Sequence, residues 1–186
     1  MKYLYSIPSP FEGKRIKINL DLMQFKEDGT ILYETAVVNN AVAILPVLDN
    51  GDVILLKVPR HAAKDDLFEA PAGKIDDVDK FKGGLRQTEL EAAKRELEEE
   101  TGYTSEDFQF AGTFYSSPGW TTEKITCFIA KKLKAGKQNL EPTEMGIEVV
   151  SMSLEKASFL LETGVIKDLK TAYLLQTYKL LNGQKI

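Results

Sequence analysis

The sequence predicts an α+β fold with an antiparallel extension at its N-terminus. Three observations support this class. Apolar side chains alternate near the N-terminus, short apolar runs are bounded by turn residues, and three segments carry apolar side chains at helical spacing. The 186 residues fit one domain with an arm. Hydrophobic residues make up 43% of the chain and charged residues 28%, which is typical of packed proteins and argues against wholesale disorder.

The N-terminal extension is expected to be a β-hairpin. Apolar side chains occupy every second position of residues 16–22, as in a half-buried strand. The sequence EDG at residues 27–29 indicates a turn, and residues 30–38 are expected to return alongside the first strand. We therefore assign residues 1–39 to the extension and residues 40–186 to the main domain.

Further strands are expected in the main domain. Residues 41–48 and 52–58 are apolar runs on either side of the sequence DNG, which is a strong turn signal. Three later segments are also predicted to be strands: residues 108–117, 124–133 and 146–152.

Three helices are predicted. The first covers residues 88–101, because Thr88 and Glu91 have the spacing of a capping box and Gly102 suits a left-handed C-terminal cap. The other two are residues 153–163, ending at Gly164, and residues 168–181. The separation of these helices from the antiparallel strands completes the α+β prediction.

The first helix carries an unusual cluster of acidic residues. Glu96, Glu99 and Glu100 fall on one face at a period of 3.6 residues, and they lie near the C-terminal end of the helix. Like charges at this spacing cost about 0.2–0.5 kcal/mol per pair, and the helix macrodipole disfavours them as well. Such a cluster is a candidate site for Mg²⁺ or Mn²⁺. On spacing alone, a solvated acidic face is an equal alternative.

Charge and cysteine content restrict the partners and the compartment. With 28 acidic and 24 basic side chains, the net charge is −4, which argues against nucleic acid or an anionic membrane as the main partner. Cys127 is the only cysteine, so an intrachain disulfide is excluded. The N-terminus lacks a signal-like apolar core, and the longest apolar stretch is too short to span a bilayer. We expect a cytoplasmic protein.

Four motifs together resemble one known family. The sequence RELEEETGY at residues 95–103 resembles the second half of the Nudix box, G-x5-E-x7-R-E-U-x-E-E-x-G-U, where U is a bulky aliphatic residue. The sequence EAPAGKID at residues 69–76 is similar to the segment before the box in the ADP-ribose pyrophosphatase branch. Pro118, 16 residues after Gly102, and the sequence GVIKDLKT at residues 164–171 also resemble that branch.

The chain departs from the family pattern in two ways. Between Gly73 and Arg95 lie 21 residues where the pattern has 13, so about eight residues are inserted within residues 77–85. The first glutamate of the box falls on Gln87, which the predicted capping box places just before the helix. The metal-binding part of the helix is expected to be intact.

The resemblance implies a Nudix-type α/β/α sandwich built on a mixed sheet. It also implies Mg²⁺-dependent hydrolysis (Mn²⁺ being possible) of the pyrophosphate bond of a nucleoside diphosphate sugar. The favoured substrate is ADP-ribose, which would give AMP and ribose 5-phosphate. The alternatives are another nucleotide sugar such as GDP-mannose, or a nucleotide-sugar-sensing module without hydrolysis. In this branch the N-terminal extension exchanges between subunits, so we expect a homodimer.

The resemblance also implies a metal site. Glu96 and Glu100 are expected to bind the metal directly, and Glu99 to bind the metal or to hydrogen bond a water on it. The carbonyl of Ala72 would add a backbone oxygen, and Arg95 would hold the acidic cluster in place. A surface salt bridge is the alternative for Arg95.

The remaining candidate residues concern catalysis and substrate binding. The general base is expected in the acidic loop at residues 141–148, with Glu144 preferred to Glu141. The candidate substrate-binding residues, by the same resemblance, are Arg60, Glu69, Pro118 and Trp120. A rim position for Arg60, a structural ion pair for Glu69 and a core position for Trp120 are the alternatives.

Overall fold

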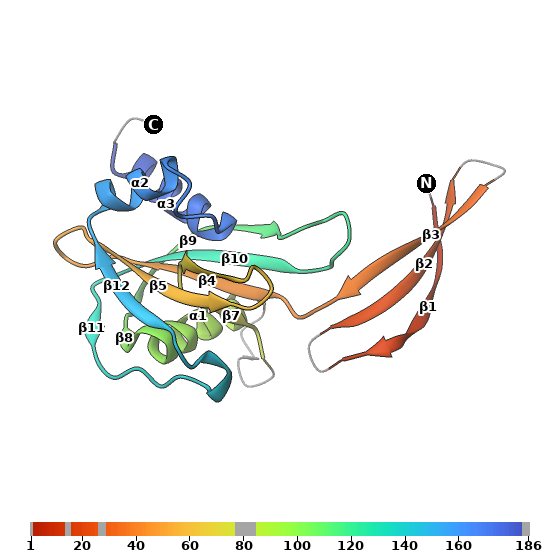
Figure 1. Cartoon of the computed structure of the whole chain (residues 1–186), viewed down its shortest axis with the longest axis horizontal. Helices are drawn as coiled ribbons and strands as arrows, with labels where there is room; N and C mark the ends of the chain where they lie inside the picture. The colour runs from red at the N-terminus through yellow and green to blue at the C-terminus, as the bar shows by residue number, and fades with distance from the viewer. Residues whose placement is uncertain (1, 14–15, 26–28, 77–84, 184–186) are drawn as a thin grey trace. The chain divides into compact units, whose positions relative to one another are not determined.

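The computed structural model describes residues 2–13, 16–25, 29–76 and 85–183 (Figure 1). The chain divides into two compact units. The first contains Met1–Asn40 and Phe114–Ile125, and the second contains Ala41–Thr113 and Thr126–Ile186.

The first unit is built on an antiparallel sheet with the strand order β1-β2-β3. Its strands are β1 (Lys2–Glu12), β2 (Lys17–Phe25) and β3 (Gly29–Val37). The predicted hairpin is confirmed, because β2 and β3 pair in register from Lys17 opposite Val37 to Phe25 opposite Gly29. The extension is larger than predicted, since β1 adds a third strand on the outer side of β2.

The sequence gives little sign of β1 because the strand contains prolines. Proline lacks a backbone N–H and is disfavoured inside sheets, but it is tolerated on edge strands. In the described sheet β1 lies at an edge, with Pro8 opposite Asn19. Asp21 on the central strand joins all three strands, because its carboxylate accepts hydrogen bonds from Ser6 on β1 and Thr35 on β3.

The rest of the chain forms two larger sheets and one short strand pair, which belong to the second unit except for the ends of β9 and β10 at residues 114–115 and 124–125. A four-stranded sheet has the order β7-β4-β10-β9, a three-stranded sheet has the order β12-β5-β6, and β8 pairs with β11. The strand bounds are β4 (Ala41–Pro46), β5 (Val53–Arg60), β6 (Asp65–Glu69), β7 (Ala72–Lys74), β8 (Tyr103–Thr104), β9 (Asp107–Tyr115), β10 (Lys124–Lys131), β11 (Lys134–Ala135) and β12 (Glu148–Met152). The predicted strands of the main domain are confirmed to within a few residues.

Helices cover both faces of the sheets. In the described residues they are α1 (Leu85–Thr101), α2 (Leu154–Glu162) and α3 (Leu169–Leu181). Figure 1 shows α1 on one side of β4 and the pair α2 and α3 on the other. Strand β4 is almost wholly buried as a result, and on the α1 side Ala92, Ala93 and Leu97 pack with Val42 and Ile44. The predicted α+β class and its sandwich arrangement are confirmed.

The predicted end of α1 is correct and its predicted start is wrong. Gly102 has φ +75°, as expected for a left-handed C-terminal cap. Thr88, however, lies inside the helix and is buried, because Leu85–Thr101 is helical throughout. Gln87 is therefore a helical residue too, and its Nε2 donates to Glu91 Oε1 at 2.7 Å, one turn later. Most of the predicted insertion lies in residues 77–84, outside the described residues.

The other helices begin and end as predicted. Ser153 caps α2 by accepting a hydrogen bond from the Lys156 N–H, and Asp168 caps α3 by accepting one from the Thr171 N–H. Gly164 follows α2 with φ +74°. In the described ranges no helix has both the length and the apolar character that a membrane span needs.

Candidate active site

Three carboxylates from two elements converge in the second unit. Glu96 and Glu100 project from the last turns of α1, and Glu144 ends the short 3-10 helix η2 (Pro142–Glu144). One carboxylate oxygen from each lies within 4.8 Å of the others. Glu96 and Glu100 are buried and Glu144 is half-buried. The structure thus brings together two of the predicted metal ligands and the preferred candidate base.

The protein alone leaves this cluster short of positive charge. Burial raises the pKa of Glu96 to about 7, and Arg95 only partly opposes this. Burial likewise raises the pKa of Glu100 to about 8, against the opposing hydrogen bond from Ala72, while Glu96 and Glu144 raise it further. Buried, converging carboxylates are hard oxygen ligands of the kind that Mg²⁺ and Mn²⁺ prefer, so these residues fit a divalent cation.

Arg95 holds the acidic side chains together. Its Nη1 lies 2.8 Å from Glu96 Oε1 and donates to Glu99 Oε2 at 2.8 Å. Its Nη2 donates to the Lys74 carbonyl at 2.9 Å. Glu99 therefore bonds to Arg95 instead of joining the three-carboxylate cluster, and its role at a metal stays a prediction. These contacts are compatible with the role predicted for Arg95, which stays a prediction.

The backbone at residues 72–73 approaches the cluster closely. The Ala72 N–H donates to Glu100 Oε2 at 2.8 Å. A Cβ atom at Gly73 would lie only 2.0 Å from the carboxylate carbon of Glu96. Gly73 is therefore needed so that β7 can lie against the Glu96 side chain. The predicted use of the Ala72 carbonyl as a ligand remains a prediction.

The end of α1 is fixed by the segment that leads to Glu144. Gln138 Nε2 donates to the Glu100 carbonyl at 2.6 Å, and the Asn139 N–H donates to the Glu99 carbonyl at 2.9 Å. These bonds satisfy two of the carbonyls that a helix leaves unpaired at its C-terminus. The same segment then places Glu144 beside Glu96 and Glu100.

Arg60 and Glu69 form a two-point ion pair next to this cluster. Arg60 Nε donates to Glu69 Oε1 at 2.6 Å, and Nη2 donates to Oε2 at 2.8 Å. Lys170 Nζ also donates to Glu69 Oε2, at 2.5 Å. Burial opposes ionisation of Glu69, but the bond from Arg60 and the charge of Lys170 outweigh it and lower the pKa. Glu69 thus makes the structural ion pair that was the alternative to substrate binding. Lys170, which lies in the GVIKDLKT segment but was given no role from the sequence, is a further residue of this site.

The other candidates are not members of the three-carboxylate cluster. Glu141 is exposed; its backbone N–H donates to Glu144 Oε2 at 2.9 Å, and its carbonyl accepts a hydrogen bond from the Glu144 N–H at 2.9 Å. Pro118 and Trp120 belong to the first unit, where the Trp120 carbonyl accepts a hydrogen bond from the Ala36 N–H at 2.7 Å. Trp120 is 58% exposed, so it is not a core residue.

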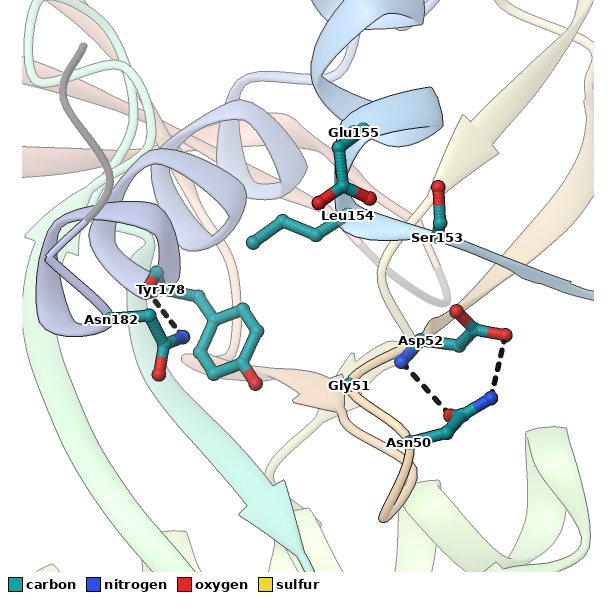
Figure 2. A pocket seen from close by; sticks show the side chains of 8 residues that line it. All are labelled: Asn50, Gly51, Asp52, Ser153, Leu154, Glu155, Tyr178 and Asn182. Carbon is teal, nitrogen blue, oxygen red and sulfur yellow. Dashed lines mark hydrogen bonds between the residues drawn. The ribbon is translucent and has the colours of Figure 1, made fainter.

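A separate hollow of about 290 Å³ lies elsewhere in the second unit (Figure 2). It is lined by the turn around Asp52, by Ser153 and Glu155 at the start of α2, and by Tyr178 and Asn182 from the end of α3. None of the predicted site residues lines it, so we place the candidate active site at the carboxylate cluster.

Comparisons with known proteins identify the family of this chain. Residues 38–174 match the model of the NUDIX domain family. The chain is 35% identical to an ADP-ribose pyrophosphatase of Bacillus subtilis (strain 168), over 172 residues that make up 91% of this chain and 88% of the relative. It is 28% identical to a methanol dehydrogenase activator of Bacillus methanolicus, over 94% of this chain and 91% of the relative.

Two further proteins extend the comparison. The chain is 33% identical to a GDP-mannose pyrophosphatase of Cronobacter sakazakii (strain ATCC BAA-894), over 76% of this chain and 74% of the relative. A crystal structure of an ADP compounds hydrolase has the same fold, with a TM-score of 0.80, 22% identity, and coverage of 98% of this chain and 94% of that one. The resemblance seen in residues 69–76 and 95–103 is thereby confirmed: the chain belongs to the Nudix family, and it is a Nudix pyrophosphohydrolase.

Proposed function

We propose that this enzyme hydrolyses the pyrophosphate bond of a nucleoside diphosphate sugar, with ADP-ribose as the favoured substrate and AMP and ribose 5-phosphate as products. The observation that carries the proposal is the convergence of Glu96, Glu100 and Glu144. The choice of substrate is supported by the similarity to an ADP-ribose pyrophosphatase over most of both chains.

We further propose Mg²⁺ as the cofactor, with Mn²⁺ as a substitute, held by Glu96 and Glu100, with the Glu144 carboxylate beside them. The raised pKa values of Glu96 and Glu100 support this, since a cation would supply the positive charge that the site lacks. When bound, such a cation neutralises phosphate oxygens, orients the diphosphate and acidifies a water. The Ala72 carbonyl and Glu99 are the further candidates for contact with it.

The chain's own residues have distinct parts in this proposal. Glu144 is the preferred general base, because it is the cluster carboxylate that comes from a loop and is only half-buried. Glu141 is the second choice. Arg95 fixes the orientation of Glu96 and Glu99 through its two 2.8 Å contacts.

Arg60 is the proposed phosphate ligand from the protein. Glu69 fixes the plane of the guanidinium through two hydrogen bonds, and the Arg60 side chain remains 46% exposed. A guanidinium held in this way presents its remaining N–H groups in a fixed direction, which suits the oxygens of a phosphate.

Turnover of a substrate panel tests this function. The panel contains ADP-ribose, ADP-glucose, GDP-mannose, UDP-glucose and a diadenosine polyphosphate, each assayed with Mg²⁺ and with chelator. We expect metal-dependent hydrolysis that is fastest on ADP-ribose. Glu100→Gln should lower kcat by about 100-fold or more, whereas Glu98→Gln, at an exposed position of the same helix, should leave it unchanged. Unchanged turnover by Glu100→Gln or by Glu99→Gln would refute the catalytic assignment.

Two alternatives are kept because relatives favour them. Preference for GDP-mannose or another nucleotide sugar would retain the site and change only the specificity, and a GDP-mannose pyrophosphatase is among the relatives. A sensing or regulatory module without hydrolysis is the second alternative, and a methanol dehydrogenase activator is also similar. Binding of a nucleotide sugar without turnover in the panel would favour this second alternative.

We also propose that the chain forms a homodimer through residues 1–39. The three-stranded sheet of the first unit exposes large apolar side chains, including Tyr5, Phe11 and Leu32. Tyr5 lies opposite Leu22, and Leu22 opposite Leu32, so the three side chains form a row across the sheet. An exposed apolar row of this kind is typical of interaction surfaces, so covering it by a second copy is favourable.

Light scattering at micromolar concentration tests the dimer. We expect a dimeric mass for the natural chain and a loss of dimer for Leu32→Glu, because a charge would enter the apolar row. Glu34→Gln, at an exposed position of the same strand, is the matched control. A monomeric mass for the natural chain would contradict the proposal.

Finally, we propose a cytoplasmic location. The single thiol, Cys127, is free and buried, and a chain without an intrachain disulfide fits a reducing compartment. Fractionation of the source cells tests this location.

A further inference from the structure

The buried Glu69 carboxylate has two cationic partners, and the proposed function uses only one of them. We propose that Lys170 is a positioning residue, which shares the charge of Glu69 and so keeps the Arg60 guanidinium available to a phosphate of the substrate. This inference rests on the proposed function, in which Arg60 binds phosphate.

Arg60 is placed so that one edge of its guanidinium faces Glu69 and another remains available. Nε and Nη2 both donate to Glu69, whereas Nη1 makes no hydrogen bond within the described residues. The bond with Glu69 raises the pKa of Arg60, and Glu100 and Asp168 add to this effect. Arg60 is therefore close enough to the carboxylate cluster to interact with its charge.

Lys170 is held by the fold and is not a mobile surface side chain. Only 13% of it is exposed, and its Nζ lies 2.5 Å from Glu69 Oε2 and 2.9 Å from Asp168 Oδ1. Asp168 is in turn fixed by the Thr171 N–H, which donates to Asp168 Oδ2 at 2.9 Å. The Thr171 hydroxyl accepts a hydrogen bond from the Ala70 N–H at 2.7 Å. The start of α3 thus fixes both Lys170 and the backbone next to Glu69.

The charge balance explains what Lys170 does. Arg60 and Lys170 carry two positive charges against the two negative charges of Glu69 and Asp168. Without Lys170 the buried Glu69 would have Arg60 as its only cationic partner in this group, and the group would become negative. A phosphate would then meet a guanidinium whose charge is cancelled by Glu69, and it would bind more weakly.

Steady-state kinetics on ADP-ribose with Mg²⁺ test this inference. Lys170→Met should raise KM about tenfold and change kcat by less than about twofold, because the effect concerns phosphate binding. Lys170→Arg should restore the KM of the natural enzyme, since the charge returns. Lys167→Met is the matched control: Lys167 is exposed and pairs with Asp65, so KM should not change.

A double-mutant cycle distinguishes charge sharing from a direct contact with substrate. In the Glu69→Gln background there is no charge to share, so adding Lys170→Met should change KM by less than about twofold. This comparison leaves no buried carboxylate at position 69. A tenfold effect of Lys170→Met in the Glu69→Gln background therefore contradicts charge sharing even if Lys170→Met alone does not fold. A tenfold effect of Lys170→Met in both backgrounds would overturn the inference, as would an unchanged KM in the natural background.

Binding of inorganic pyrophosphate in the presence of Mg²⁺, measured by calorimetry, separates this inference from the proposed function. Lys170→Met should weaken pyrophosphate binding about tenfold relative to the natural chain and to Lys167→Met. If no nucleotide sugar is turned over but this loss is observed, the proposed function fails and the inference stands. If nucleotide sugars are turned over and the variants bind pyrophosphate equally, the inference fails and the function stands.

Discussion

Replacement of Gly73 by alanine places a methyl group against a proposed metal ligand. A Cβ at this position would lie 2.0 Å from the Cδ and Oε1 atoms of Glu96 and 2.2 Å from Oε2. Ordinary van der Waals contact begins at 3.4 Å, so the carboxylate would have to retreat by about 1.4 Å. The Glu96 carboxylate has little room for this movement, because the Glu96 side chain is buried and Arg95 Nη1 already lies 2.8 Å from its Oε1.

Two effects follow from this clash. Overpacking should destabilise the protein by about 1–3 kcal/mol. Displacing a ligand by more than 1 Å should lower kcat by about 100-fold and raise the Mg²⁺ concentration needed for half-maximal rate. Thermal denaturation and a Mg²⁺ titration of the hydrolysis rate measure the two effects separately.

Gly119→Ala is the control for this experiment. No atom lies within 4 Å of a Cβ built at Gly119, so the alanine fits without a clash. We expect its Mg²⁺ dependence to match that of the natural enzyme. If Gly73→Ala also kept the natural Mg²⁺ dependence and kcat, the close approach of β7 to Glu96 would have no part in the site.

Three further predictions follow. The folded pKa values of Glu96 and Glu100, about 7 and about 8, exceed the ordinary value of 4.5, so between pH 4.5 and pH 8 the folded protein binds more protons than the unfolded chain. In chelator, the stability should therefore fall as the pH rises from about 4.5 to about 8. Thermal denaturation should also show that the stabilisation by Mg²⁺ grows over the same pH range. Arg95→Lys keeps the charge but cannot reproduce the contacts to Glu96, Glu99 and the Lys74 carbonyl, so kcat should fall about tenfold or more. The control is Lys94→Arg, which alters a neighbouring side chain and should have little effect on kcat. Asp168→Ala removes the cap of α3 and a partner of Lys170, and chemical denaturation should report a loss of about 1–2 kcal/mol.

The sequence predicted well those features that depend on neighbouring residues. The end of α1 at Gly102, the common face of Glu96 and Glu100, and the position of Arg95 follow from helical periodicity and from the motif in residues 95–103. The prediction that α1 begins at Thr88 was wrong, because a threonine followed three residues later by a glutamate also occurs in the interior of a helix. Pairing of Gln87 with Glu91 extends the helical turn instead.

Features that depend on distant contacts were not predictable in the same way. Lys170 and Glu69 both lie in motifs recognised in the sequence, but they are 101 positions apart, and neither motif shows that the two side chains meet. Glu144 was preferred to Glu141 only by resemblance, and the fold of residues 138–144 decides which of the two carboxylates joins the cluster. Strand β1 was missed because its prolines disfavour a strand wherever the position in the sheet is unknown.

The way in which α1 ends has a consequence for the order of binding. The last turn of this helix carries acidic side chains and no basic one, and neutral donors from Gln138 and Asn139 complete its hydrogen bonds. The negative end of the helix macrodipole therefore adds to the charge of the carboxylates. A diphosphate that approaches this end alone is repelled, whereas a cation is attracted to it. Cation and diphosphate therefore favour each other's binding, and the enzyme is expected to bind the cation first or together with the diphosphate.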